Sequence, residues 1–269
     1  MSWAPVTESV TERVADFPAR AMAATLSRPE DFTPGTPLPP LWHWFHCLKL
    51  YPMTEAGADG HQALGHFLPD LGLPRRMWAG GRFTFYRMPV IGAEVTRTSV
   101  VSNVAQKEGR SGPIAFVTVS HRWTDAEGAV IDEEQDVVYR RADAPAGATV
   151  PAPKGETLSR EMSVGPVDLF RYSALTFNGH RIHYDRDFCA LEGYDGLVVH
   201  GPLLATLLLD LLRIEGARWP LTFQFRAMAP VTADTPFTLC ATLNGNEATL
   251  WIRRHDGVQA MSATATLRP

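Results

Sequence analysis

The apolar positions of the first 26 residues recur at near-helical spacing. They are Val6, Val10, Val14, Phe17, Met22 and Leu26. This spacing predicts an amphipathic helix from Pro5 to about Thr25, with Thr7 or Ser9 available to cap its first turn. A proline-rich passage, TPGTPLPPLWHW, then interrupts the pattern.

Between Arg82 and Arg141 the chain becomes rich in β-branched and aromatic residues, which predicts strands. Within this block IAFVTVSHRW and AVIDEEQDVVYR flank a turn with Asp125 and Gly128. Two more alternating runs close the chain around Asp256-Gly257. Alternating runs on both sides of a short Asp/Gly turn indicate antiparallel hairpins.

The two halves of the chain also resemble each other. The stretch FTFYRMPV from Phe83 is echoed by FQFRAMAPV from Phe223, and a similar order of elements follows each. Between them, ADAPAGATVPAPKGE has the composition of an exposed linker. These features favour a duplication, with domains 1–152 and 153–269, over the alternative of two unrelated β-rich segments.

The stretch from His200 to Arg213 predicts one long helix. Leucines cover most of its circumference, so it should be buried against a sheet. Pro202 fits its first turn, where a missing N–H costs nothing. The element order therefore suggests an α+β fold in which an antiparallel sheet wraps around a central helix, once in each half.

Composition narrows the function classes. The 269 residues are 45% hydrophobic with a formal charge of -4, so phosphate neutralisation gives no support to nucleic-acid binding. Three widely spaced cysteines suggest reduced thiols and a cytoplasmic protein. No apolar run approaches the roughly 20 residues of a membrane span, so we expect no membrane association.

Candidate chemistry gathers in RYSALTFNGHRIHYDRD, from Arg171 to Asp187. A neutral imidazole at His183 can move a proton, the Asn178 amide can hold a water, and the N–H of Gly201 at the helix start can polarise a carbonyl. Together these groups suit addition or removal of water beside a carbonyl. Ordinary loop histidines and a simple helix boundary remain the alternative for the same residues.

Other polar clusters have plainer interpretations. His43 and His46 are three residues apart, but no carboxylate or cysteine accompanies them at ligand spacing, so we expect aromatic packing or a pocket wall and no metal. An acidic cluster on an alternating strand is interpreted as a solvated face; it comprises Asp132, Glu133, Glu134 and Asp136.

Arg75-Arg76 beside Trp78 has two interpretations, a phosphate clamp or a soluble loop. The chain contains no GxSxG, no GxxxxGK and no GxGxxG after a strand. These absences weaken hydrolase, kinase and dehydrogenase interpretations together.

The segments YSALTFNGHRIH, from Tyr172, and GLVVHG, from Gly196, resemble the hydratase motif of the MaoC-like, hot-dog-fold enoyl-thioester hydratases and dehydratases. The resemblance is strongest to the double-hot-dog branch, which includes mesaconyl-C4-CoA hydratase, itaconyl-CoA hydratase and the mitochondrial 3-hydroxyacyl-thioester dehydratase. It spans the chain nearly end to end. It implies two tandem hot-dog units, a degenerate N-terminal one that forms the acyl and coenzyme A pocket and an active C-terminal one.

The family motif runs Gly-Asp-x-Asn-Pro-apolar-His. Its aspartate falls on Asn178, its Asn-Pro on His180 and Arg181, and its catalytic histidine on His183. An amide cannot take a proton, so the resemblance implies His183 as acid/base with Asn178 orienting water. The family's oxyanion donor corresponds to Gly201.

The resemblance also suggests substrate-binding residues. A guanidinium at Arg181 is suited to a second carboxylate of the substrate, unless it pairs with Asp185 or Asp187. The remaining substrate-binding candidates are His180, Tyr172, Tyr184 and His200. Leucine, phenylalanine and tryptophan residues of the N-terminal half would shape the acyl tunnel.

The implied activity is reversible hydration of an α,β-unsaturated acyl-CoA, with a short branched dicarboxylic group such as itaconyl-, mesaconyl-C4- or 3-methylfumaryl-CoA. Coenzyme A is then part of the small-molecule substrate, and we expect no further cofactor. A homodimer is plausible from the relatives. The alternatives are a 3-hydroxyacyl-[acyl-carrier-protein] dehydratase of fatty acid synthesis and a non-catalytic acyl-thioester binder.

Overall fold

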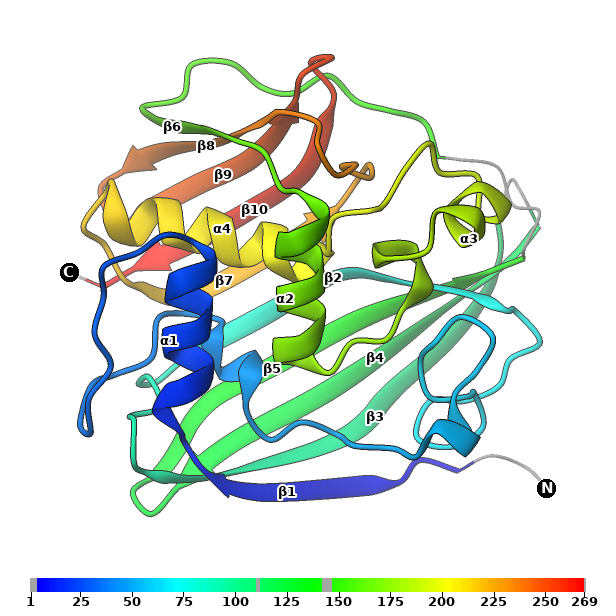
Figure 1. Ribbon diagram of the computed structural model, residues 1–269, viewed down its shortest axis with the longest axis horizontal. Helices are drawn as coiled ribbons and strands as arrows, with labels where there is room; N and C mark the ends of the chain where they lie inside the picture. Colours follow the sequence, from blue (N-terminus) through cyan, green and yellow to red (C-terminus); the bar gives the residue numbers. More distant parts are fainter. Residues whose placement is uncertain (1–3, 110–111, 142–146, 269) are drawn as a thin grey trace.

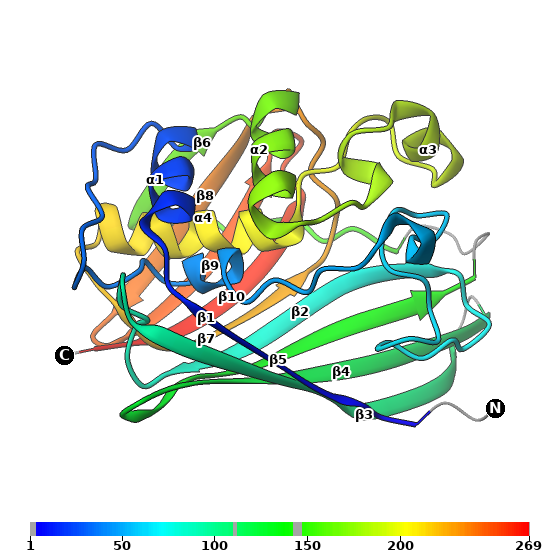
Figure 2. The ribbon, with the colours of Figure 1, turned by 60° about the horizontal axis from the view of Figure 1, so that its bottom comes forward.

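A computed structural model describes residues 4–109, 112–141 and 147–268 of the protein. One antiparallel sheet of ten strands carries the fold, and Figures 1 and 2 show the helices together on one of its faces. The strands are β1 (Thr7–Arg13), β2 (Arg75–Phe85), β3 (Glu94–Gly109), β4 (Gly112–Asp125), β5 (Gly128–Arg140), β6 (Leu158–Met162), β7 (Pro220–Ala227), β8 (Phe237–Asn244), β9 (Glu247–Arg254) and β10 (Gln259–Leu267). The helices are α1 (Asp16–Thr25), α2 (Pro166–Thr176), α3 (Arg186–Leu191) and α4 (Gly201–Ile214), with 3-10 turns η1 (Trp42–Phe45), η2 (Met53–Glu55) and η3 (Arg181–His183).

The strand order is the same in the two halves, read outward from a central seam. The sheet runs β1-β3-β4-β5-β2-β7-β10-β9-β8-β6, so β2 and β7 pair where the halves meet. Phe83 lies directly opposite Phe223 across this seam. The order confirms the repeat, and β4–β5 and β9–β10 confirm both hairpins. The division near residue 152 stays a prediction, and residues 142–146 of the proposed linker lie outside the described part.

The predicted helix from Pro5 to Thr25 is wrong in its first half. Residues Thr7–Arg13 form β1, which pairs with β3 at the edge of the sheet. Ser9 and Thr11 hydrogen-bond across the pair to threonines of β3, at 3.0 and 2.7 Å. β-branched residues favour an extended backbone, and tertiary pairing decides against an apolar spacing that fits a helix equally well. The helix begins at Asp16.

The long predicted helix is present as α4, and it forms the centre of the C-terminal unit. Its residues from Leu203 to Leu212 are all buried. Fully burying a leucine stabilises a fold by roughly 1.5–3 kcal/mol, so this helix anchors the core. No helix in the described ranges is long and apolar enough to cross a membrane. The three cysteines are free and buried.

The N-terminal unit lacks a counterpart of α4 within residues 4–109. The segment before β2 is instead irregular, with left-handed backbone at Gly60, Gly65 and Gly72. Glycine costs about 1 kcal/mol relative to alanine inside a helix, so this sequence favours a loop. The two tandem hot-dog units are therefore unequal: a helix fills the second, and a loop that reaches toward the seam replaces it in the first.

Candidate active site

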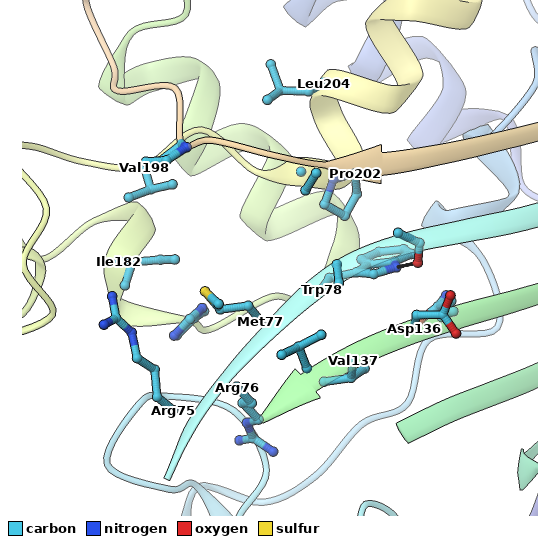
Figure 3. A pocket seen from close by; sticks show the side chains of 18 of the residues that line it. Arg75, Arg76, Met77, Trp78, Asp136, Val137, Ile182, Val198, Pro202 and Leu204 are labelled. Atoms are coloured by element: carbon cyan, nitrogen blue, oxygen red, sulfur yellow. Dashed lines mark hydrogen bonds between the residues drawn. The ribbon is translucent and has the colours of Figure 1, made fainter. Parts of the chain in front are cut away.

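A cavity of about 1150 Å³ lies where the two units meet. Figure 3 shows Arg76, Met77 and Trp78 of β2 on its wall, together with Ile182, Val198 and, from α4, Pro202 and Leu204. Apolar side chains of the N-terminal half also line it, as expected for an acyl tunnel; they are Phe67, Leu68, Trp78 and Phe116. Ligand pockets typically measure about 300–1,000 Å³, so this cavity has room for part of a coenzyme-sized ligand.

The turn that presents the polar groups follows directly from the end of α2. Phe177 adopts a left-handed conformation, with φ of 50°, and ends the helix. Asn178 Oδ1 then accepts a hydrogen bond from the His180 backbone N–H at 2.9 Å. This local turn is one that asparagine favours. It occupies the amide oxygen and leaves Nδ2, a donor, as the group that Asn178 can offer to a ligand in the cavity it lines.

His183 has a defined tautomer. Its Nδ1 lies 2.7 Å from the Val198 carbonyl oxygen, which can only accept, so Nδ1 carries the proton. Nε2 is therefore a free lone pair, with no hydrogen-bond partner in the described part of the chain. Burial, aided by the neighbouring His180, lowers the pKa of His183 to about 3. The ring is thus neutral across the physiological range.

Four imidazoles form a continuous row beside the cavity, which we call the histidine row: His61, His180, His183 and His200. Neighbouring ring centroids are 4.7, 5.6 and 3.5 Å apart in that order. Burial is the largest cause lowering the pKa of each, to about 4 for His61 and about 3 for His180. The pKa of His200 lies well below its usual value for the same reason. The row is therefore uncharged near neutral pH.

Gly201 is the first residue of α4 and lines the same cavity. The backbone N–H groups of a helix's first turn have no partner within the helix, and the dipole favours negative charge there. A Cβ on Gly201 would meet nothing within 4 Å, so there is open space beside this residue. This group is suited to receive a carbonyl oxygen that gains negative charge.

A loop of the N-terminal half holds the catalytic turn in place. The Gly60 and Gly179 backbones approach so closely that a Cβ on Gly60 would lie 2.0 Å from the Gly179 carbonyl oxygen. The Arg181 N–H donates to the Asp59 carbonyl at 2.9 Å, and the Tyr51 hydroxyl donates to the Gly60 carbonyl at 2.8 Å. The loop also carries His61 into the site. Sequence reasoning missed His61, because nothing local relates it to a turn nearly 120 residues away.

The other predicted site residues lie further from the cavity. Arg181 donates to Asp185 Oδ2 at 2.9 and 2.6 Å and lies over the Phe188 ring, so the structure has the ion pair that the sequence left as an alternative. Tyr184 is 57% exposed. Tyr172 and His200 are buried behind His183, with ring centroids 5.0 Å apart. None of these four residues is among the described residues that line the cavity.

The arginine pair on β2 lines the cavity but is already paired. Arg75 contacts the Glu192 carboxylate at 2.6 Å. Arg76 donates to both oxygens of Asp59, at 2.8 and 3.1 Å, and to the Gln62 carbonyl at 2.8 Å. Arg76 thereby braces the loop that carries His61.

The acidic cluster on β5 is not a uniformly solvated face. Glu133 is 2% exposed and accepts hydrogen bonds from the ring nitrogen of His43 at 3.2 Å and from Trp44 at 2.8 Å. Burial opposes its ionisation, but these donors and the nearby imidazoles hold its pKa at about 2. It lies on the core face because it follows Ile131 by two positions on the strand. His43 packs among aromatic rings there, as predicted, and outside the cavity.

This arrangement combines a neutral imidazole base, an amide donor and a helix-start N–H around one cavity. Asn178, His183 and Gly201 all line this cavity. Such a site can add water to a polarised double bond or remove it.

Comparison with known proteins identifies a dehydratase family and relatives that match this chain. The family described as hydroxyacyl-thioester dehydratase type 2 matches residues 41–233. Mesaconyl-C(4)-CoA hydratase of Chloroflexus aurantiacus is 45% identical over 99% of this chain and 97% of its own. The mitochondrial hydroxyacyl-thioester dehydratase type 2 of Schizosaccharomyces pombe is 26% identical over 81% of each chain.

Solved structures support the fold. A MaoC-like dehydratase superposes with a TM-score of 0.71 at 14% identity, covering 98% of this chain and 97% of the other. HtdX of Mycobacterium tuberculosis gives 0.68 at 17% identity, covering 97% and 99%. At these identities the likeness concerns the fold alone, and it confirms the predicted double hot dog.

Proposed function

The chain belongs to the hydroxyacyl-thioester dehydratase type 2 family, and from that premise we propose that it is a hydro-lyase that reversibly adds water to the double bond of an α,β-unsaturated acyl-CoA. The observation that carries this proposal is the fixed tautomer of His183. A proton on Nδ1, held by the Val198 carbonyl at 2.7 Å, leaves Nε2 as a base beside Asn178 in the cavity.

In the hydration direction, Asn178 Nδ2 donates to the oxygen of a water, which positions a lone pair toward the β-carbon. His183 Nε2 accepts one proton of this water as its oxygen bonds to the β-carbon. The π electrons move toward the thioester, and the Gly201 N–H stabilises the negative charge on the carbonyl oxygen. The proton on His183 then passes to the α-carbon, and dehydration is the reverse path.

His200 and Tyr172 act through His183 in this scheme. His200 stacks on His183 with ring centroids 3.5 Å apart, and its Nε2 lies 2.8 Å from the Ser173 hydroxyl. Tyr172 packs on the far side of His200. These contacts fix the plane of the catalytic ring, so we assign both residues to positioning and not to substrate contact. Tyr184 packs near the surface of the same turn.

For the acyl group we propose a short branched dicarboxylic one, of the mesaconyl-C4, itaconyl or 3-methylfumaryl type. The support is the relative of 45% identity, whose name specifies mesaconyl-C(4)-CoA. Coenzyme A enters as part of the substrate, and the scheme needs no other cofactor. A cytoplasmic location and a homodimer remain predictions beside it. A second candidate is dehydration of 3-hydroxyacyl groups on acyl-carrier protein; the names of the family and of the yeast relatives, hydroxyacyl-thioester dehydratase type 2, support the dehydration and specify no carrier.

Hydration is measured by the loss of ultraviolet absorbance of crotonyl-, mesaconyl- and itaconyl-CoA. We expect turnover with wild-type protein and a fall in kcat of about 10²–10⁴ in His183→Ala, because general-base catalysis typically contributes that much. Asn178→Ala should lower kcat by a smaller factor. The exposed His255→Ala serves as the matched control and should keep full activity. Absence of turnover with all three thioesters, or an unchanged rate in His183→Ala, would refute the proposal.

The oxyanion donor is testable because proline is tolerated at a helix's first position. His200, with ψ of 127°, already has the extended backbone that a following proline requires. Gly201→Pro should therefore keep α4 but delete the N–H and lower kcat by about 10²–10³. Gly201→Ala retains the N–H and should stay far more active. Equal rates in the two variants would remove Gly201 from the mechanism.

A further inference from the structure

Two members of the histidine row have no assigned role in hydration. His61 and His180 face each other from opposite halves of the chain, with ring centroids 4.7 Å apart, and both line the cavity. Neither ring makes a side-chain hydrogen bond within the described ranges, and neither has a buried, unsatisfied ring nitrogen. Their N–H groups are therefore available to a ligand in the cavity, next to His183.

The charged groups around this pair are Arg76 and Asp59. Arg76 lies on the same wall, close enough to His61 to be the main charge that lowers its pKa. The carboxylate closest to the pair is Asp59, and both of its oxygens are already bound to Arg76. A negatively charged group that enters here meets the two imidazole N–H donors beside an ion pair whose charges offset each other.

Arg181, the carboxylate anchor suggested by the sequence, is committed elsewhere. Two of its nitrogens bind Asp185, a third donates to the Ala58 carbonyl at 3.2 Å, and its plane lies over Phe188. Its contacts brace the turn from outside the cavity. A second carboxylate on the substrate therefore needs another partner.

We propose that His61 and His180 together bind the free carboxylate of a dicarboxylic acyl group, so that the N-terminal half determines acyl specificity. This inference rests on the proposed function for the placement of the thioester at Gly201. Each neutral imidazole donates one N–H to a carboxylate oxygen, and Arg76 keeps Asp59 from repelling the anion by pairing with it. An uncharged ring has a small desolvation penalty, so both imidazoles can line the cavity without a counter-ion. They can still form charge-assisted hydrogen bonds with an anion that binds there.

The test uses two saturated thioesters of equal chain length, succinyl-CoA and butyryl-CoA, which differ in a terminal carboxylate and which cannot be hydrated. Affinities are measured by isothermal titration calorimetry on the full-length protein. We expect the wild type to bind succinyl-CoA at least tenfold more tightly, the size expected for a hydrogen bond to a charged group.

His61→Phe keeps the ring stack but removes the donor, so it should lower the affinity for succinyl-CoA about tenfold and leave that for butyryl-CoA unchanged. His61→Gln keeps an N–H donor and should retain part of the preference. His66→Phe, on the same loop but outside the cavity, is the matched control. Arg181→Ala should leave the ratio of the two affinities unaltered.

The proposal is overturned if the wild type shows no preference for succinyl-CoA, if His61→Phe weakens both ligands equally, or if Arg181→Ala alone abolishes the preference. Equal weakening would indicate a structural role for His61. Binding is measured without turnover, so a failure of the hydration assay refutes the proposed function separately from this result.

Discussion

Lowering the pH from 7 to about 5 is expected to destabilise the protein steeply, because it folds with several imidazoles kept neutral. Burial lowers the pKa of His121 and of His61 to about 4, and that of His180 and His183 to about 3, against an ordinary value of 6.5. Near pH 5 these residues are protonated in the unfolded chain and unprotonated in the folded one. Stability is therefore fully present above pH 6.5 and is lost as the pH falls toward the folded values.

The magnitude follows from linkage. One pKa unit corresponds to about 1.4 kcal/mol, so each such imidazole costs about 2 kcal/mol at pH 5. His121 and His183 are at least nine-tenths buried and should contribute nearly in full. His200, which is fully buried and whose pKa is also lowered well below its usual value, adds a third such imidazole. His61 and His180 are only partly buried and contribute less, because solvent reaches them. The free energy of unfolding should thus fall with a slope of roughly three to five protons, against a total that is typically about 5–15 kcal/mol.

Urea unfolding at equilibrium, followed by tryptophan fluorescence between pH 7 and pH 5, measures this slope. The low pKa values of Glu133 and Asp59 do not interfere, since the stability they add is lost only at more acidic pH. His121→Asn should flatten the slope by about one proton, whereas the exposed His255→Gln should not change it. A wild-type slope below one proton would refute the assignment of neutral buried imidazoles.

Two further predictions concern features of the N-terminal half. Gly60→Ala should lower hydration activity at least tenfold, because its Cβ would clash with the Gly179 backbone and displace the catalytic turn; Gly65→Ala has a similar φ but open space and should stay active. Comparable rates in the two variants would contradict this. Glu133→Ala should lower the free energy of unfolding by about 3 kcal/mol, measured by urea titration, because it leaves buried donors unpaired. The neighbouring Glu134→Ala should cost less than about 1 kcal/mol, and equal costs would show that Glu133 is not structurally special.

The hydrophobic pattern of the sequence predicted secondary structure correctly where that pattern and the turn residues determine the structure locally. The leucine-rich stretch could only be a buried helix, and the alternating runs around Asp125 and Asp256 could only be hairpins, as α4 and the paired strands show. The repeat around Phe83 and Phe223 identified two equivalent strands, and the structure shows that these strands pair at the seam. In these regions side-chain period and turn chemistry agree with each other.

Prediction failed where distant partners decide the outcome. The spacing of Val6, Val10 and Val14 fits a helix, but pairing with the edge of β3 places Thr7–Arg13, which includes Val10, in β1. The prediction of a solvated Glu133 was wrong because it rested on the charge of the side chain and not on its position on the core face of the strand. Its partners His43 and Trp44 lie about 90 residues earlier in the chain. Such contacts leave no local signal in one sequence.

The amide at Asn178 and the uncharged histidine row are physically linked. Its Oδ1 accepts the His180 N–H, a role that an aspartate oxygen would fill equally well, so the turn alone does not require asparagine. An aspartate would, however, add a negative charge beside His180 and His183, raise their pKa values and repel a carboxylate that approaches His61. In a site that receives a second carboxylate, an amide can hold the water without opposing the substrate. The departure from the family's aspartate is thus the change expected for an anionic acyl group, and it leaves His183 to carry the proton alone.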